Sequence, residues 1–282
     1  MSETVALRQR IGLFALFLLC GLLIFVAGDL LKNEIQLIFR ICLTVAFLLI
    51  ALWFRNKKRI GRYFQVTFAF FIVSLVTLLN SLLPLPGSSA GPTVKGYLLQ
   101  QVLSTLVIVI PIALLTRVSG SSMGSIYLQK GRLRLGLIIG LVPFLFFVIL
   151  ILAFPAGLKY ASMFFSISEE ITYEQILSLM PAVVVYVLLN GLKEELWYRG
   201  VFLRKFETFV GAWPSNILTA LVFAASHVGV SYTPALLIFL GMTFVLGLIC
   251  GYVMQKTNSI IGPALLHAAM DITIALGAFS FL

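Results

Sequence analysis

Long apolar runs divided by short charged clusters leave this chain few ways to fold. The runs are roughly 17 to 25 residues long, which is the length that an α-helix needs to cross the hydrocarbon core of a bilayer. Hydrophobic residues make up 61% of the 282 residues and charged residues 11%, so a water-soluble globule would lack polar residues to cover its surface. Within a bilayer, helices satisfy their own backbone hydrogen bonds. The sequence therefore predicts an all-α, polytopic membrane protein without a soluble domain.

We predict eight or nine transmembrane helices. The first run follows Arg8 and Arg10, but it is long for a signal peptide and lacks a cleavage pattern, so we interpret it as the first span. The stretch 173–210 leaves two interpretations open: one span with an amphipathic tail, or two short spans, which would invert the topology downstream. With one span there, the nine predicted ranges are about 11–28, 36–54, 63–83, 98–116, 135–154, 181–202, 213–229, 234–254 and 259–281.

Basic residues recur in alternate loops between the predicted spans. Lys and Arg are enriched in cytoplasmic loops, so we expect these loops and the amino terminus in the cytoplasm and the carboxyl terminus outside. The intervening loops include 84–92 and 166–174, the latter with three glutamates, and are expected outside. Orientation also accounts for the net charge of +10, so we expect no nucleic-acid partner. We predict a multi-pass protein of a prokaryotic plasma membrane. The basic segments are 55–62, 117–134, 204–205 and Lys256.

The three cysteines lie inside apolar runs and show no CxxC spacing. They are Cys20, Cys42 and Cys250. This pattern does not favour structural disulfides or a cysteine metal site.

Ionisable residues, whose transfer into hydrocarbon is unfavourable, are distributed unevenly among the predicted spans. Among the first five predicted spans, the only deeply placed charge is Arg40, whose long side chain can snorkel to the interface. The later spans hold several ionisable residues. We therefore divide the chain into supporting helices over 1–172 and a functional module over 173–282, whose last four spans form a catalytic core.

Two adjacent glutamates lie within the predicted span 181–202. Placing a carboxylate in hydrocarbon costs a few kcal/mol, so this pair needs an explanation. Glu195 and Arg199 are four residues apart on one helix face, which predicts a structural ion pair and leaves Glu194 free for proton transfer. The same residues would also suit the wet interfacial end of a helix. This motif alone leaves both interpretations open.

Both histidines of the chain lie in predicted spans of the same module. His227 follows Phe223 by one turn, and His267 precedes Asp271 by one turn. A single buried histidine is more often structural, but two histidines with an aspartate and a glutamate pair favour a functional site. A helical rise of about 1.5 Å per residue places Glu194 roughly 15 Å, His267 roughly 13 Å and His227 roughly 20 Å from the cytoplasmic ends. We expect these polar side chains in one layer.

Aromatic residues accompany these motifs and could line a pocket. They are Trp197, Tyr198 and Phe223. Such aromatic residues more often serve packing or an interfacial belt, so we assign them no catalytic role.

Taken together, three motifs resemble those of the CAAX-prenyl-protease-2 and bacteriocin-processing (CPBP) family of intramembrane proteases. They are Glu194-Glu195-x-x-x-Arg199, Phe223-x-x-x-His227 and His267-x-x-x-Asp271, in the same order and with fitting separations. The resemblance covers about 175–282 and implies hydrolysis of peptide bonds within the membrane. The implied partners are membrane lipids and a peptide or lipidated protein substrate.

The resemblance also implies roles for the residues that match its motifs. Glu194 with His227 would activate a water molecule, and His267, helped by Asp271, would stabilise the tetrahedral oxyanion. Arg199 would hold Glu195 in place. The third motif of the family often ends in asparagine, so Asp271 is open between orienting His267 and acting as an acid or metal ligand.

Three alternatives follow from the same residues. Glu194, His227 and His267 are ordinary ligands for a divalent metal such as zinc, which would make the protein a metalloendopeptidase, although the HExxH spacing of common zinc proteases is absent. Intramembrane Glu, His and Asp also build proton relays in transporters. A non-catalytic membrane scaffold could retain the same fold.

Overall fold

The structure is a computed structural model that describes residues 7–83, 93–158, 162, 164–168 and 171–282. Every regular element in these ranges is a helix, which confirms the all-α prediction. The predicted outer loop 84–92 lies outside the described residues, as do Glu169 and Glu170 of the glutamate-rich loop.

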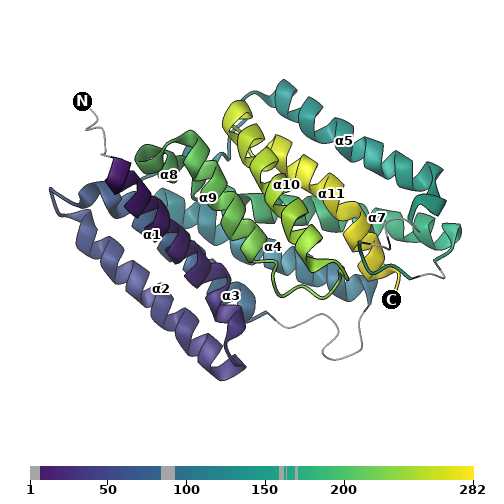
Figure 1. Ribbon diagram of the computed structural model, residues 1–282, viewed down its shortest axis with the longest axis horizontal. Helices are drawn as coiled ribbons and strands as arrows, with labels where there is room; N and C mark the ends of the chain where they lie inside the picture. The colour runs from purple at the N-terminus through teal and green to yellow at the C-terminus, as the bar shows by residue number, and fades with distance from the viewer. Residues whose placement is uncertain (1–6, 84–92, 159–161, 163, 169–170) are drawn as a thin grey trace.

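Eight helical stretches of the described chain are long and apolar enough to span a membrane. They make the protein an integral multi-pass membrane protein. Figure 1 shows α1 and α2 at one end of the molecule, α5 at the other, and α9, α10 and α11 between them. The α-helices are α1 (Leu7–Phe25), α2 (Asn33–Arg55), α3 (Phe64–Ser81), α4 (Val94–Val118), α5 (Leu133–Ala153), α7 (Tyr173–Glu194), α8 (Leu203–Val210), α9 (Ala212–Ala225), α10 (Leu236–Thr257) and α11 (Ile261–Phe279).

The span predicted over 213–229 is shorter than expected. Helix α9 has 14 residues and ends at Ala225. At about 1.5 Å per residue it is about 21 Å long, which is less than the roughly 30 Å of the hydrocarbon core. The predicted boundary was therefore wrong at this end, and His227 lies two residues beyond the helix.

The ambiguous stretch 173–210 forms one continuous helical segment of 38 residues. Helix α7 passes directly into a π-helical turn, η5 (Glu195–Gly200), and then into α8. Helix α8 buries Leu203, Phe206 and Val210, which recur at amphipathic spacing. The interpretation with one span and an amphipathic tail is therefore the one that matches the structure.

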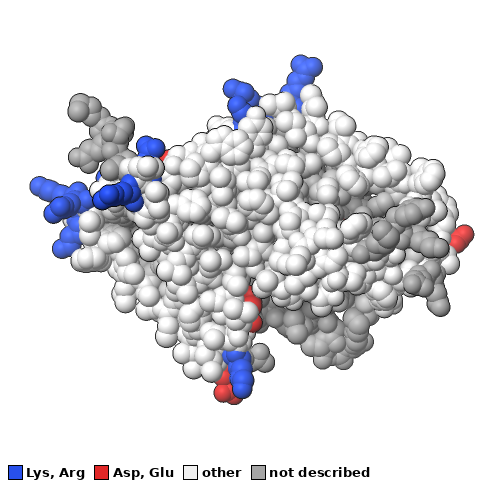
Figure 2. Space-filling view, in the orientation of Figure 1, with Lys and Arg blue, Asp and Glu red and all other residues white. Residues whose placement is uncertain are grey.

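Loops that were predicted on the same side of the membrane meet in the structure. The backbone N–H of Arg132, before α5, donates to the carbonyl of Thr257 at the end of α10, with an N···O distance of 2.6 Å. At the opposite end, the N–H of Ser166 donates to the carbonyl of Tyr232 at 2.9 Å. In Figure 2, most of the visible Lys and Arg lie along the left and upper edges of the molecule, and a further basic cluster lies beside acidic residues at the lower edge. The bundle thus has one strongly basic end, whereas the described residues of the other end are mostly acidic or uncharged.

Two apolar cores hold the bundle together. One core joins α1–α3 to the segment from η5 to α9, and the other joins α5, α7 and α11. Within the first core, the ring of Phe17 stacks on Phe206 with 4.8 Å between centroids, and Phe25 stacks on Tyr198 at 4.3 Å. The predicted supporting helices therefore pack directly against the predicted functional module.

The sequence predicted that the side chain of Arg40 reaches the membrane interface. In the structure this side chain is instead buried and paired. Its residue is 7% exposed, and its Nη2 donates to Asp29 Oδ1 at 2.5 Å. Its Nη1 also donates to the carbonyl of Thr77 at 3.3 Å. Arg40 thus fastens α2 to the turn after α1 and to α3.

Gly191 permits the close approach of α7 and α11. A Cβ atom at this position would lie 2.3 Å from the carbonyl oxygen of Ala264, which belongs to the backbone of α11 and cannot move aside freely. The contact lies one turn from Glu194 on α7 and one turn from His267 on α11. The spacing of the two helices therefore sets the spacing of the polar residues.

We expect a Gly191→Ala variant to lose about 1–3 kcal/mol of stability, because the added methyl group forces α7 and α11 apart. Thermal unfolding in mild detergent would measure the loss. A Gly241→Ala variant is a matched control, since nothing lies within 4 Å of the added atom on α10. Equal unfolding temperatures for the two variants would contradict the packing role of Gly191.

Candidate active site

A buried ion pair forms the base of the candidate site. Arg199 Nη1 donates to Glu195 Oε1 at 2.6 Å, and both side chains have no solvent exposure. Arg199 Nε also donates to the carbonyl of Gly247 on α10 at 3.2 Å, and its guanidinium lies 4.3 Å from the centre of the Phe223 ring on α9. The ion pair predicted from the spacing is present, and it connects η5 to α9 and α10.

The two glutamates lie where the helix changes its winding. Glu194 ends α7, and Glu195 begins the π-helical turn, in which the N–H of Val201 donates to the carbonyl of Leu196 at 3.1 Å. All six residues of this turn are buried. Wide turns of this kind inside α-helices often mark functional sites.

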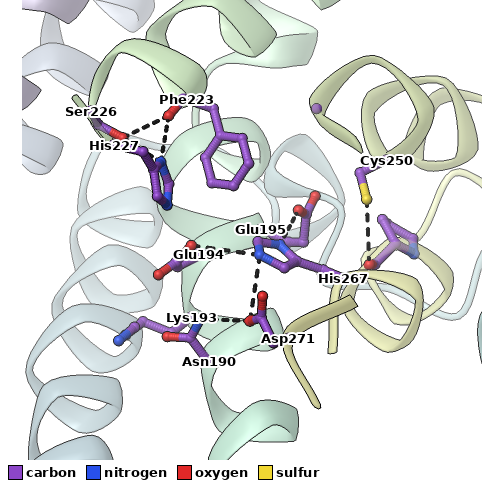
Figure 3. Close-up of polar contacts among 12 residues, drawn as sticks. Asn190, Lys193, Glu194, Glu195, Phe223, Ser226, His227, Cys250, His267 and Asp271 are labelled. Atoms are coloured by element: carbon purple, nitrogen blue, oxygen red, sulfur yellow. Dashed lines mark hydrogen bonds and ion pairs between the residues drawn. The ribbon is translucent and has the colours of Figure 1, made fainter. Parts of the chain in front are cut away.

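His267 lies at the centre of the acidic residues (Figure 3). Its Nδ1 is 2.8 Å from Glu195 Oε1, whereas its Nε2 is 3.6 Å from Glu194 Oε2 and 3.6 Å from Asp271 Oδ2. An ionised carboxylate only accepts hydrogen bonds, so Nδ1 carries the proton of this short contact. Glu195 therefore orients His267 directly, while Asp271 lies beyond hydrogen-bond distance. The sequence had left Asp271 open between orienting this histidine and acting as an acid or a metal ligand.

Asp271 belongs to a chain of polar side chains that reaches into α4. Asn190 Nδ2 donates to Asp271 Oδ2 at 2.8 Å, and Gln101 Nε2 donates to Asn190 Oδ1 at 3.2 Å. Lys193, which is buried, donates to Gln101 Oε1 at 3.2 Å. Sequence reasoning had assigned no role to Asn190 or Gln101. Their signal is the presence of amide side chains inside otherwise apolar spans.

His227 enters the site from the turn after α9. Its Nδ1 is 2.7 Å from the backbone carbonyl of Phe223, and the two rings meet edge to face with centroids 4.7 Å apart. Because a carbonyl only accepts, the contact places the proton on Nδ1 and leaves Nε2 for the cavity that His227 lines. The backbone thus fixes the orientation of this ring.

One cavity of about 220 Å³ brings the candidate residues together. Glu194, His227, His267 and Asp271 all line it, and Phe223 forms part of its wall. Trp197 and Tyr198 do not line the cavity; both lie in the first core, where they contact Phe25. The polar wall is accompanied by a mostly apolar wall of Phe165, Phe239, Met242, Leu246, Met270 and Ile274.

The described residues do not form the metal centre that the sequence left open as an alternative. No group of three or more His, Cys, Asp or Glu side chains among them is placed to hold a metal ion. The predicted ligand set Glu194, His227 and His267 therefore does not fit a metal here, and we derive no step through one.

Comparison with known proteins gives one result that bears on this site. Residues 175–273 match the family model described as Type II CAAX prenyl endopeptidase Rce1-like. The match is consistent with the CPBP family and includes all three motifs that line or support the cavity. No curated protein and no solved structure matches the chain.

Proposed function

We propose that this membrane protein, whose residues 175–273 match the Rce1-like family of type II CAAX prenyl endopeptidases, is an intramembrane endopeptidase. The observation that carries the proposal is the convergence of Glu194, His227 and His267 on one cavity within the bundle. A carboxylate and two oriented imidazoles are the groups that general acid–base hydrolysis needs. Each comes from a different element, so the fold and not local sequence brings them together.

In the proposed reaction, Glu194 with His227 accepts a proton from a water molecule. The resulting hydroxide oxygen bonds to the carbonyl carbon of the substrate, and the carbonyl oxygen becomes an oxyanion. His267 donates a hydrogen bond to that oxyanion from Nε2. The proton held by Glu194 then passes to the amide nitrogen, the C–N bond breaks, and a carboxylic acid and an amine leave.

The buried pair of Glu195 and Arg199 supports this reaction without touching the substrate. Arg199 neutralises Glu195, and Glu195 accepts from His267 Nδ1, so the imidazole keeps its Nε2 directed at the cavity. Two carboxylates lie 3.6 Å from Nε2, and their negative charge favours a proton there. His267 is thus suited to donate to an oxyanion.

The role of Asp271 can be tested by an Asp271→Asn variant. We expect its cleavage rate to fall roughly 10- to 100-fold, the range typical of residues that tune a directly acting group. The measurement is the cleavage rate of the purified variant beside the wild type at equal amounts of folded protein. An unchanged rate would contradict a role of Asp271 in the reaction.

The proposal itself is tested by comparing membrane peptides from cells that produce the wild type, Glu194→Gln or His227→Ala. We expect a set of cleavage products, detected by mass spectrometry, that depends on both residues. Folded protein must be present at equal amounts in all three strains. If no product depends on either residue, the chain is a non-catalytic scaffold or a transporter and the proposed function is wrong.

A further inference from the structure

The two ends of the bundle differ strongly in charge. Arg55, Arg59 and Arg117 lie exposed in or beside the loops of one end, whereas the described loops of the opposite end contain as basic residues only Lys32 and Lys95. In Figure 2 most of the visible basic side chains lie on one side of the molecule, and the one basic cluster at the lower edge lies beside acidic side chains. Since Lys and Arg are retained on the cytoplasmic side, the basic end faces the cytoplasm. The end that contains Ser166 and Tyr232 then faces outward.

The cavity extends from the catalytic residues toward that outward end. Helix α11 begins at the basic end, and the cavity follows it past Asp271 to Ile274 and Ala275. Phe239, in the first turn of α10, and Tyr232, in the loop before it, also line the cavity. Ile274, Ala275 and Phe239 thus lie in the outward halves of α11 and α10, and Tyr232 lies in the loop between α9 and α10.

The opposite path, from the cavity to the cytoplasm, is filled by protein. The turn η5 follows Glu194 on the cytoplasmic side, and each of its residues is buried. Glu195 and Arg199 have no solvent exposure at all. Among the described residues, none of the turn η5 or of α8 lines the active-site cavity.

The short helix α9 explains how water can reach the site from outside. Because α9 starts at the cytoplasmic end and is about 21 Å long, the non-helical segment 226–235 that follows it lies within the outer part of the hydrocarbon layer. Irregular backbone at that depth is tolerated only when it is buried in protein or lines a water-filled cavity. His227 and Tyr232 of this segment line the cavity described above.

We infer that the active-site cavity opens to the non-cytoplasmic side of the membrane, and that its substrate is a membrane-bound peptide cut in or beside the outer leaflet. The inference rests on the proposed function for its substrate class. The apolar wall of the cavity fits apolar side chains next to the scissile bond, and the volume of about 220 Å³ holds only a few of them. A carboxyl-terminal tail that stays on the cytoplasmic face would not reach Glu194.

Cysteine accessibility in intact cells tests the direction of opening. In a chain with Cys20, Cys42 and Cys250 replaced by alanine, Ser231→Cys and Ser122→Cys form a matched pair of exposed loop positions at opposite ends. A charged, membrane-impermeant thiol reagent should modify Ser231→Cys in intact cells and Ser122→Cys only after permeabilisation. The reverse pattern would overturn the inference.

A second matched pair tests whether the cavity itself contains water. Ile274→Cys lies in the cavity wall, whereas Ile249→Cys lies exposed on α10, on the membrane-facing surface. We expect Ile274→Cys to react from outside about tenfold or more faster than Ile249→Cys, because only a hydrated thiol forms the thiolate. Met242→Cys is the alternative probe if Ile274→Cys does not fold. Reaction of the cavity position from the cytoplasmic side alone would contradict the inference.

The accessibility experiment is independent of catalysis. It can be repeated in a Glu194→Gln background, in which the proposed function predicts no cleavage. Labelling from outside without any Glu194-dependent cleavage would support the outward opening of the cavity and contradict the endopeptidase function. Glu194-dependent cleavage with labelling from the cytoplasm alone would support the endopeptidase function and contradict the outward opening.

Discussion

A Glu194→Gln variant is expected to lose cleavage by roughly 10²- to 10⁴-fold, the usual contribution of a general base. Glutamine keeps the shape and the hydrogen-bonding reach of the side chain, but it cannot accept the proton of water. The effect should appear in the rate of the chemical step and leave substrate binding nearly unchanged. The measurement is the cleavage rate of a peptide identified from the membrane peptides, with purified protein in a bilayer-like environment.

Glu174→Gln provides the control for this variant. Glu174 lies in the first turn of the same helix, is exposed and does not line the cavity. The control should cleave at the wild-type rate. Equal activity of both variants would reject Glu194 as the base, and equal loss would indicate damage to α7 and not to the chemistry.

An Arg199→Ala variant is expected to be the most destabilising single substitution in the site, by about 3–5 kcal/mol. It would leave the carboxylate of Glu195 buried without its counter-charge, and it would remove the contacts of the guanidinium with Gly247 and Phe223. Unfolding in a denaturing detergent titration would measure the change. Arg117→Ala, at an exposed arginine, should stay within about 0.5 kcal/mol of the wild type.

A double variant separates charge burial from packing at this position. Replacing Glu195 with leucine and Arg199 with methionine removes both charges and keeps most of the volume. We expect this variant to recover much of the stability that Arg199→Ala loses, because paired buried charges can often be replaced by apolar residues. It should remain inactive, since His267 loses the acceptor for its Nδ1 proton. Wild-type cleavage in the double variant would contradict the supporting role.

Much of this fold follows from hydropathy and spacing alone. Apolar runs of membrane length predicted the helices, since helical backbone hydrogen bonds are local and need no knowledge of the neighbours. The pairing of Glu195 with Arg199 was also predictable, because both residues lie on one helix and their separation fixes their relative direction.

The contacts between helices could not be predicted from the sequence. The bond from His267 to Glu195 depends on the rotation and approach of α7 and α11, which the backbone contact at Gly191 sets. The involvement of Gln101 depends on where α4 packs. The end of α9 was missed because Val228 and Val230 continue the apolar run past Ala225, so hydropathy cannot distinguish a longer helix from an irregular segment covered by protein.

The number of residues in the π-helical turn Glu195–Gly200 matters for the buried ion pair as much as the identity of those residues. In this turn one more residue occupies the axial distance of an ordinary helical turn. Deleting one residue between Glu195 and Arg199 would restore α-helical winding and keep α8 in its present register, because the turn holds one residue more than an ordinary turn. Arg199 would then follow Glu195 by three residues instead of four, so the guanidinium and the carboxylate would meet at a different angle. The extra residue therefore sets the geometry of the buried ion pair and not the direction of α8.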